Sequence, residues 1–326
     1  MGRVDPKDVA APIARRGTGR GRNTHLMVAA CATVAAVLAL LLLPTPAGAV
    51  VGGTLAEPGQ FPYAAAGFPN DCSGSLIAPT WVLTAAHCHR DVQVMRIGST
   101  SQNEGGELIV VKRNVAHPNY VSTDTASPND LRLVELEHPA AATPVTLARA
   151  DQPSLDAPGV EATIAGYGDI CSPFDPDNPV CFEAYKLRWA TFPIISTSAC
   201  ANGQPYYATL DGKSMLCTLF PGGGKSPCRR DSGGPLVVVA NGKTVQVGVV
   251  QGGEEPCGRP DGPAVYMRVS AFLPWISDVT GIDFNAPTST TTTSTTSTTS
   301  TTVPPGPATA STPVPSPVAV VPKFAG

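Results

Sequence analysis

The segment 228–240 reads CRRDSGGPLVVVA and joins two patterns that predict different local structures. Ser232 stands between an aspartate and two glycines, in a turn whose backbone can approach another molecule closely because glycine has no side chain. Residues 235–240 then form a valine-rich run, which is typical of a β-strand. The segment therefore predicts a serine held in a turn at the start of a strand.

Strand-like segments of the same kind recur between Val50 and about residue 285. They are short, rich in Val, Ile and Leu, and separated by Gly, Pro, Asn and Asp, which indicates an all-β protein. They are SLIAPTWVLTAA (75–86), ELIVVKRNV (107–115), LRLVELE (131–137), EATIAGYG (161–168), PLVVVA (235–240) and TVQVGVVQGG (244–253). One helix is expected near the end, with Ser270 as its N-cap and Gly281 as its stop.

The first 49 residues have the pattern of an export signal. A basic region precedes the uncharged apolar run 27–43, and Ala47, Gly48 and Ala49 form a small-residue cleavage site. We therefore expect residues 1–49 to be removed as an N-terminal extension and signal peptide, and the mature chain to be secreted and not inserted in a membrane. Twin-arginine export and retention of the apolar run as a membrane anchor are the alternatives.

Composition narrows the class of protein and of partner. The chain is 42% hydrophobic and 14% charged, and its 32 Gly and 34 Pro favour a loop-rich β protein. Six basic and two acidic residues lie in 1–49, so sixteen basic and twenty-three acidic side chains remain, a formal charge of −7. This acidic balance argues against nucleic acid and anionic membrane surfaces as partners.

Residues 286–326 differ from the rest of the chain. Residues 288–302 are only Thr and Ser, and a Pro-rich stretch follows, so the segment cannot bury a core and is expected to be disordered. An O-glycosylated stalk, a cell-wall spacer and an inert tail all fit this composition. The Ala-rich signal and the Thr-rich tail suggest a bacterial source. The predicted organisation is a signal (1–49), one folded domain (50–285) and a disordered tail (286–326).

The chain has nine cysteines, of which Cys31 lies in the signal region. An even set of eight in an exported chain predicts disulfides and an oxidising compartment; the eight are Cys72, Cys88, Cys171, Cys181, Cys200, Cys217, Cys228 and Cys257. A zinc site is not expected, because there is no CxxC pair and the histidines are not clustered with cysteines. The short spacing of Glu104 and Glu107 favours a solvated turn over a calcium loop, so we predict no metal and no cofactor.

Four motifs stand in a specific order along the chain: VVGG at Val50–Gly53, His87 in WVLTAAHC, Asp130 in NDLRLVEL and Ser232 in CRRDSGGPL. Together they resemble the chymotrypsin/trypsin-like serine protease family, with its order of His, Asp and Ser, over roughly residues 50–281. The resemblance implies two six-stranded antiparallel β-barrels packed side by side with the catalytic residues between them, and a C-terminal helix.

The resemblance implies a secreted, monomeric endopeptidase that acts on protein or peptide substrates and is bound by protein inhibitors. A serine hydroxyl is a weak nucleophile at neutral pH and needs an adjacent base. His87 would take the proton of Ser232 and return it to the leaving amine, while Asp130 would hold the imidazole in the correct tautomer. A catalytically weak or inactive homologue that binds peptides, and an esterase of small molecules, are the alternative functions.

The resemblance also assigns roles to VVGG and to the cysteines. The free α-amine of Val50 would pair with the buried Asp231, and because Ala49 is the predicted cleavage site, export and activation would be one event. The implied disulfides are Cys72–Cys88, Cys200–Cys217 and Cys228–Cys257. The remaining cysteines, Cys171 and Cys181, have no counterpart in the family pattern; as the pair left over they would close a Pro- and Asp-rich loop near the active site.

Arg230 departs from the family pattern. It stands where the family has a glycine, whose N–H forms the oxyanion hole with the N–H of Ser232. Arginine keeps the N–H but loses the conformational freedom of glycine, and strained geometry there would cost about 1 kcal/mol or more. Arg229 and Arg230 would favour acidic residues after the cleaved bond, or obstruct tight protein inhibitors, or be tolerated exposed charges.

The expected substrate pocket departs from the pattern as well. Ser226 stands at its base, where trypsin-like members have an aspartate, so we predict no preference for Lys or Arg. Ala264 would narrow the pocket opposite Gly253, which favours medium apolar side chains. Gln251 and Gly252 replace a serine and a tryptophan, so binding on the non-prime side should be weaker or differently shaped.

Overall fold

The computed structural model describes residues 50–69, 72–88, 91–123, 125–170, 185–201, 205–253 and 255–285. The predicted signal, the predicted tail and the pair Cys171–Cys181 lie outside these residues. Within the described part of the chain, no helix combines the length and the apolar character needed to cross a membrane.

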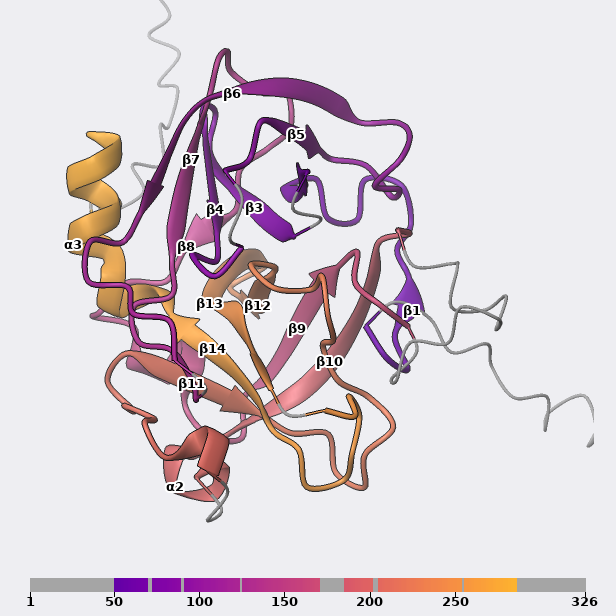
Figure 1. Cartoon of the computed structure of the whole chain (residues 1–326), viewed down its shortest axis with the longest axis vertical. Coiled ribbons are helices and arrows are strands. Elements are labelled where there is room, and N and C mark those ends of the chain that lie inside the picture. The colour runs from indigo at the N-terminus through magenta and orange to yellow at the C-terminus, as the bar shows by residue number, and fades with distance from the viewer. Residues whose placement is uncertain are drawn as a thin grey trace, which may run out of the picture. The chain divides into compact units, whose positions relative to one another are not determined.

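The first barrel is built from the N-terminal half of the domain (Figure 1). Its strands follow the order β2-β3-β4-β7-β6-β5, each antiparallel to its neighbours, and β5 pairs with β2 to close the barrel. The predicted run 75–86 forms two strands, because Ala78 pairs with Trp81 across a tight turn. The strands are β2 (Ala64–Phe68), β3 (Ser73–Ala78), β4 (Trp81–Thr84), β5 (Val94–Ile97), β6 (Glu107–Ala116) and β7 (Arg132–Leu136).

The second barrel follows the order β10-β11-β14-β13-β12-β9, and β9 pairs with β10 to close it. Two short strands extend this sheet: β1 (Thr54–Leu55) beside β10 and β8 (Thr146–Leu147) beside β13. The barrel strands are β9 (Glu161–Gly166), β10 (Arg188–Ile195), β11 (Met215–Thr218), β12 (Pro235–Ala240), β13 (Lys243–Gly253) and β14 (Ala264–Arg268). The expected pair of six-stranded antiparallel barrels is confirmed.

The helix α3 (Val269–Thr280) ends the domain, as expected, and Gly281 follows it with φ 71° as its C-cap. The prediction of Ser270 as N-cap is wrong. Because β14 runs directly into α3, Arg268 at the strand end takes the N-cap position and Ser270 lies in the first turn. The other described helices are short: η1 (Pro153–Asp156), α2 (Thr197–Cys200) and η3 (Pro205–Tyr207).

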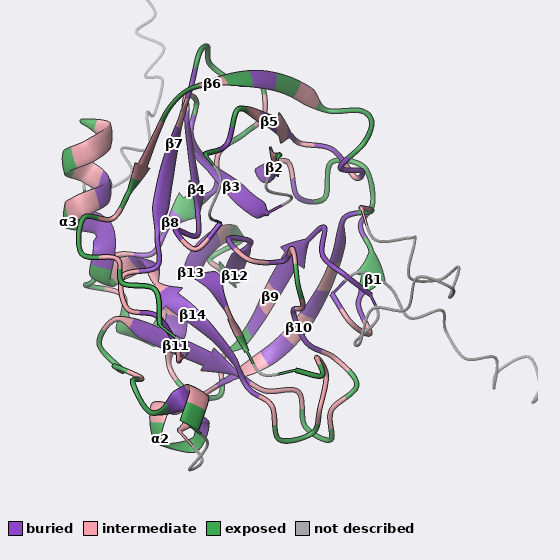
Figure 2. Ribbon diagram, in the orientation of Figure 1, coloured by how far each residue is buried: buried purple, intermediate pink, exposed green. Residues whose placement is uncertain are grey.

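Many of the barrel strands are buried (Figure 2). Polar contacts also join the two barrels. The hydroxyl of Ser75 on β3 donates to Gln246 Oε1 on β13 at 2.8 Å, and both side chains are buried. The backbone N–H of Ser73, also on β3, donates to the carbonyl of Arg230 at 3.1 Å. Because buried polar groups need partners, these contacts help to hold the loop before β12 against the first barrel.

Candidate active site

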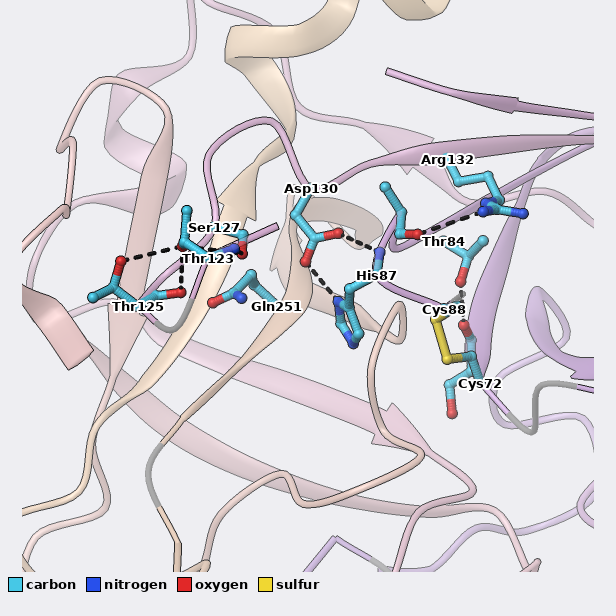
Figure 3. A network of polar contacts seen from close by, with 12 residues as sticks. Cys72, Thr84, His87, Cys88, Thr123, Thr125, Ser127, Asp130, Arg132 and Gln251 are labelled. Carbon is cyan, nitrogen blue, oxygen red and sulfur yellow. Dashed lines mark hydrogen bonds and ion pairs between the residues drawn. A yellow bond between two sulfur atoms is a disulfide. The ribbon is translucent and has the colours of Figure 1, made fainter. Parts of the chain in front are cut away.

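His87 and Asp130 meet because the strands next to them are paired. His87 follows β4 and Asp130 precedes β7, and Thr84 of β4 lies opposite Arg132 of β7. Asp130 is fully buried; its Oδ1 accepts the backbone N–H of His87 at 2.8 Å, and its Oδ2 lies 2.6 Å from His87 Nδ1 (Figure 3). An ionised carboxylate can only accept, so Nδ1 carries the proton and Nε2 is left with its lone pair to act as a base.

Ser232 comes from the second barrel, in the turn just before β12. The next residue, Gly233, has φ 81°, and a Cβ there would stand 2.1 Å from Thr84 Oγ1 and 2.4 Å from the Ser73 carbonyl oxygen. Only glycine permits this approach. The serine turn is thereby pressed against the end of β4, three residues before His87.

Asp231 is fully buried beside this turn. Its Oδ1 accepts the N–H of Gly168 at 2.9 Å and its Oδ2 accepts the N–H of Cys228 at 2.8 Å. A Cβ at Gly166 or Gly168 would lie within 2.4 Å of the carboxyl group, so these glycines make room for it. Burial raises the pKa of Asp231 to about 7 in the chain that continues before Val50, and nearby Asp169 adds to this.

Val50 is also fully buried and packs in the core of the second barrel. Its φ is 51°, a conformation that is strained for a β-branched residue. Val51 forms a bridge with Ser226, so the VVGG segment runs beside the residue that the sequence predicted for the base of the substrate pocket.

Arg230 has φ 70°, in the left-handed region that glycine adopts freely. For an L-residue this conformation costs about 1–2 kcal/mol. Contacts hold it on two sides: its carbonyl accepts the N–H and hydroxyl of Ser73 at 3.1 and 2.9 Å, and its guanidinium lies 3.3 Å from Asp169. The guanidinium also stacks 5.1 Å from the ring centre of Tyr185.

Arg229 is paired as well. Its guanidinium makes a bidentate contact with Glu255 at 2.5 and 2.9 Å, and this pairing raises its pKa. Both arginines therefore have a carboxylate partner within the chain, which lessens the charge they could offer to a substrate.

A cavity of about 120 Å³ opens beside Ser232. It is lined by Ser226, Pro227, Cys228, Arg229, Ser232, Val250, Gly252, Gly253, Glu255 and Cys257. At the buried Ser226, the hydroxyl donates to the carbonyl of Pro227 at 2.7 Å. Ala264 pairs with Gly253 in the sheet but packs in the core of the second barrel, so its expected effect on pocket width stays a prediction.

Tyr206 lies outside every sequence motif. It contacts Gln251 and Gly252, the positions where the sequence lacks the family's serine hydroxyl and tryptophan ring. Its hydroxyl donates to Gln251 Oε1 at 3.0 Å. A Cβ built on Gly252 would stand 2.8 Å from that hydroxyl oxygen and 3.9 Å from ring atom Cζ. An aromatic side chain at position 252 and the phenol of Tyr206 therefore compete for the same space. Tyr206 supplies a hydroxyl and a ring beside two residues that lack both.

The structure contains the disulfides Cys72–Cys88, Cys200–Cys217 and Cys228–Cys257. Cys72–Cys88 closes the loop that ends next to His87, and Cys228–Cys257 forms part of the cavity wall. Glu104 and Glu107 have separate partners: Glu104 is 2.8 Å from Lys186 Nζ, and Glu107 accepts the N–H of Ala141. No group of acidic, His or Cys side chains suited to a metal ion occurs among the described residues.

Comparisons with known proteins agree with this architecture. The trypsin family model matches residues 50–276. Trypsin-10 of Gadus morhua is 36% identical over 210 residues, which cover 64% of this chain and 80% of that protein. Kallikrein-8 of Homo sapiens is 34% identical over 245 residues, covering 71% and 86%. The solved structure of neuropsin, a serine protease expressed in the limbic system of mouse brain, matches with a TM-score of 0.59 and 30% identity, covering 70% of this chain and 98% of that chain. The chain belongs to the trypsin family of serine endopeptidases.

Proposed function

We propose that the mature chain begins at Val50 and is a secreted endopeptidase that hydrolyses peptide bonds through an acyl-enzyme. The observation that carries this proposal is the buried Asp130 at 2.6 Å from His87 Nδ1, at the same end of the barrels as the turn of Ser232. The substrates would be proteins or peptides, with protein inhibitors as further partners.

In this proposal His87 Nε2 accepts the proton of Ser232 as the hydroxyl attacks the peptide carbonyl. The tetrahedral intermediate collapses when the same imidazole returns that proton to the leaving amine. Water then attacks the ester carbonyl of the acyl-enzyme, with His87 taking its proton and returning it to Ser232 as the acid product leaves. The backbone N–H groups of Arg230 and Ser232 would bind the oxyanion. Their contribution is large, since losing one donor costs about 10²–10³ in kcat.

Primary specificity would follow from the cavity beside Ser232. Its base holds the hydroxyl of Ser226, and the acidic residue in its lining, Glu255, is already paired with Arg229. A lysine or arginine side chain would lose its hydration there without gaining a free carboxylate. With a volume of about 120 Å³, the cavity suits medium apolar side chains such as Leu, Met or Val.

Activation would follow from cleavage before Val50. The released α-amine would pair with the buried Asp231 and order the neighbouring oxyanion hole. The backbone of Val50 supports this idea, because its φ of 51° is strained only while a peptide bond precedes the residue. A free N-terminal residue has no φ. Cleavage by signal peptidase during export would then also activate the enzyme, and the tail 286–326 would link it to the cell wall.

The test is the intact mass of the secreted protein before and after treatment with a fluorophosphonate, which marks a serine activated by its base and oxyanion hole. We expect a mass that begins at Val50 and one adduct, which is lost in Ser232→Ala. A mass that begins before Val50 would contradict activation by signal peptidase.

One observation favours the second candidate, an inactive homologue that binds peptides: position 230 holds an arginine in place of glycine, so its left-handed φ of 70° is kept at a cost in strain. For that function we expect no adduct at Ser232 and no turnover of casein, with peptide binding retained. Casein turnover that Ser232→Ala abolishes would refute it. Comparing ester with peptide turnover separates the endopeptidase from a small-molecule esterase.

A further inference from the structure

We propose that Asp169 is a positioning residue that holds the N–H of Arg230 in the oxyanion hole. This inference rests on the proposed function, because it concerns how one donor of that hole is kept in place. Asp169 lies after β9, outside every motif, and it contacts the Arg229–Arg230 segment with both its backbone and its side chain.

The backbone contact fixes the direction of a peptide plane. The N–H of Asp169 donates to the carbonyl of Arg229 at 2.8 Å. In a trans peptide the carbonyl and the following N–H point in opposite directions. Because the Arg229 carbonyl faces Asp169, the N–H of Arg230 points away from it. If this peptide turned over, the carbonyl of Arg229 would take the place of the N–H of Arg230. The oxyanion hole would then hold a hydrogen-bond acceptor where it needs a donor.

The side-chain contact helps to restrain the φ of Arg230. This dihedral angle describes rotation about the bond between N and Cα, so any change in it swings the N–H of the same residue. The carboxylate of Asp169 lies 3.3 Å from Arg230 Nη1, and the ring of Tyr185 stacks on the guanidinium. Together with the two Ser73 bonds to the Arg230 carbonyl, these contacts hold an L-residue at φ 70°.

Burial makes the pair hard to break. The side chain of Asp169 is 6% exposed, whereas that of Arg230 is 30% exposed. Desolvation raises the pKa of Asp169, while Arg230 and Arg229 lower it and Glu255 raises it. Asp169 Oδ1 has no hydrogen-bond partner among the described residues, so the guanidinium at 3.3 Å acts on it through charge, and loss of that charge would leave the buried carboxylate uncompensated.

The test is Asp169→Asn, made both in the native chain and in the Arg230→Gly background. Asparagine keeps the backbone N–H and the volume of aspartate but removes the charge. Glycine at position 230 adopts positive φ without help and has no side chain to hold. In the native chain we expect kcat on a short peptide substrate to fall about tenfold with KM within about twofold, the signature of a lost transition-state contact. In the Arg230→Gly background we expect kcat to change less than about twofold.

A matched control is Asp156→Asn, which breaks another ion pair with a buried carboxylate, Arg268 Nη1 to Asp156 Oδ1 at 2.6 Å, between the end of β14 and η1. It should lower the melting temperature and leave kcat unchanged. An unchanged kcat in Asp169→Asn, or an equal loss in both backgrounds, would overturn the positioning role. Fluorophosphonate labelling of the native chain separates the two failures: with no adduct, the proposed function fails and this inference fails with it, whereas an adduct together with an unaffected Asp169→Asn refutes this inference alone.

Discussion

Retaining a single residue before Val50 should make the stability of the folded protein depend strongly on pH. The perturbation compares protein that begins at Val50 with protein that begins at Ala49. In the longer form the nitrogen of Val50 is an amide and carries no charge. Asp231 then remains fully buried, with the N–H groups of Gly168 and Cys228 as its hydrogen-bond donors.

The magnitude follows from the pKa of Asp231. Burial raises it from 3.8 to about 7 in the chain that continues before Val50. Between these values the folded protein binds a proton that the unfolded chain has released, so stability falls as pH rises. A shift of about three units corresponds to about 4 kcal/mol. In the shorter form the charged α-amine pairs with the ionised Asp231 and offsets this loss until the amine itself loses its proton, at a pH of about 8 or above.

The assay is urea unfolding between pH 4 and pH 9 with the disulfides intact, followed by tryptophan fluorescence. At about pH 8 the Val50 form should be more stable by an amount on the order of 4 kcal/mol, and the difference should shrink towards pH 4. Asp231→Asn is the matched control, because it removes the titrating group and should flatten the pH dependence of the Ala49 form. Equal pH dependence in the two forms would refute the reasoning, as would an Ala49 form whose slope survives Asp231→Asn.

Other substitutions test the site directly. Ser226→Asp places a carboxylate at the base of the cavity and should raise kcat/KM for arginyl over leucyl peptides at least about tenfold; an unchanged ratio would mean that this cavity does not bind the residue before the cleaved bond. Tyr206→Ala removes the ring beside Gly252 and should raise KM about threefold or more for long peptides but not for short ones, and equal effects on both would count against a subsite there. Gly233→Ala places a Cβ 2.1 Å from Thr84 Oγ1 at φ 81°, so kcat/KM should fall at least about a hundredfold with a lower melting temperature, and a fully active variant would show that the turn can move.

The sequence was informative where function depends on local patterns. His87, Asp130 and Ser232 each lie in a short motif, and the strands beside them are rich in Val and Leu. Pairing of β4 with β7 then brings the first two side chains together without further information. The strands that the sequence did not single out, such as β10 and β14, become clear only through their pairing partners.

What the sequence could not predict depends on contacts between distant segments. Nothing local links Tyr206 to Gly252, or Asp169 to Arg230, because these partners are brought together by the closure of the second barrel and its loops. The predicted N-cap at Ser270 was wrong for a related reason: β14, which the sequence did not single out, runs directly into α3 at Arg268.

These distant contacts change the weight of the departures from the family pattern. Taken alone, an arginine at position 230 and the loss of a hydroxyl and an aromatic ring at positions 251 and 252 favour an inactive homologue. In the folded chain, Asp169 and Tyr185 hold the arginine, and Tyr206 provides a hydroxyl and a ring at the other site. A replaced group impairs function only if no other segment of the chain supplies its role. These departures therefore argue against catalysis only if the compensating contacts do not contribute to activity. If Asp169→Asn left kcat unchanged and Tyr206→Ala left KM unchanged, the compensating contacts would not contribute to activity. The departures from the family pattern would then again favour a binding protein over an enzyme.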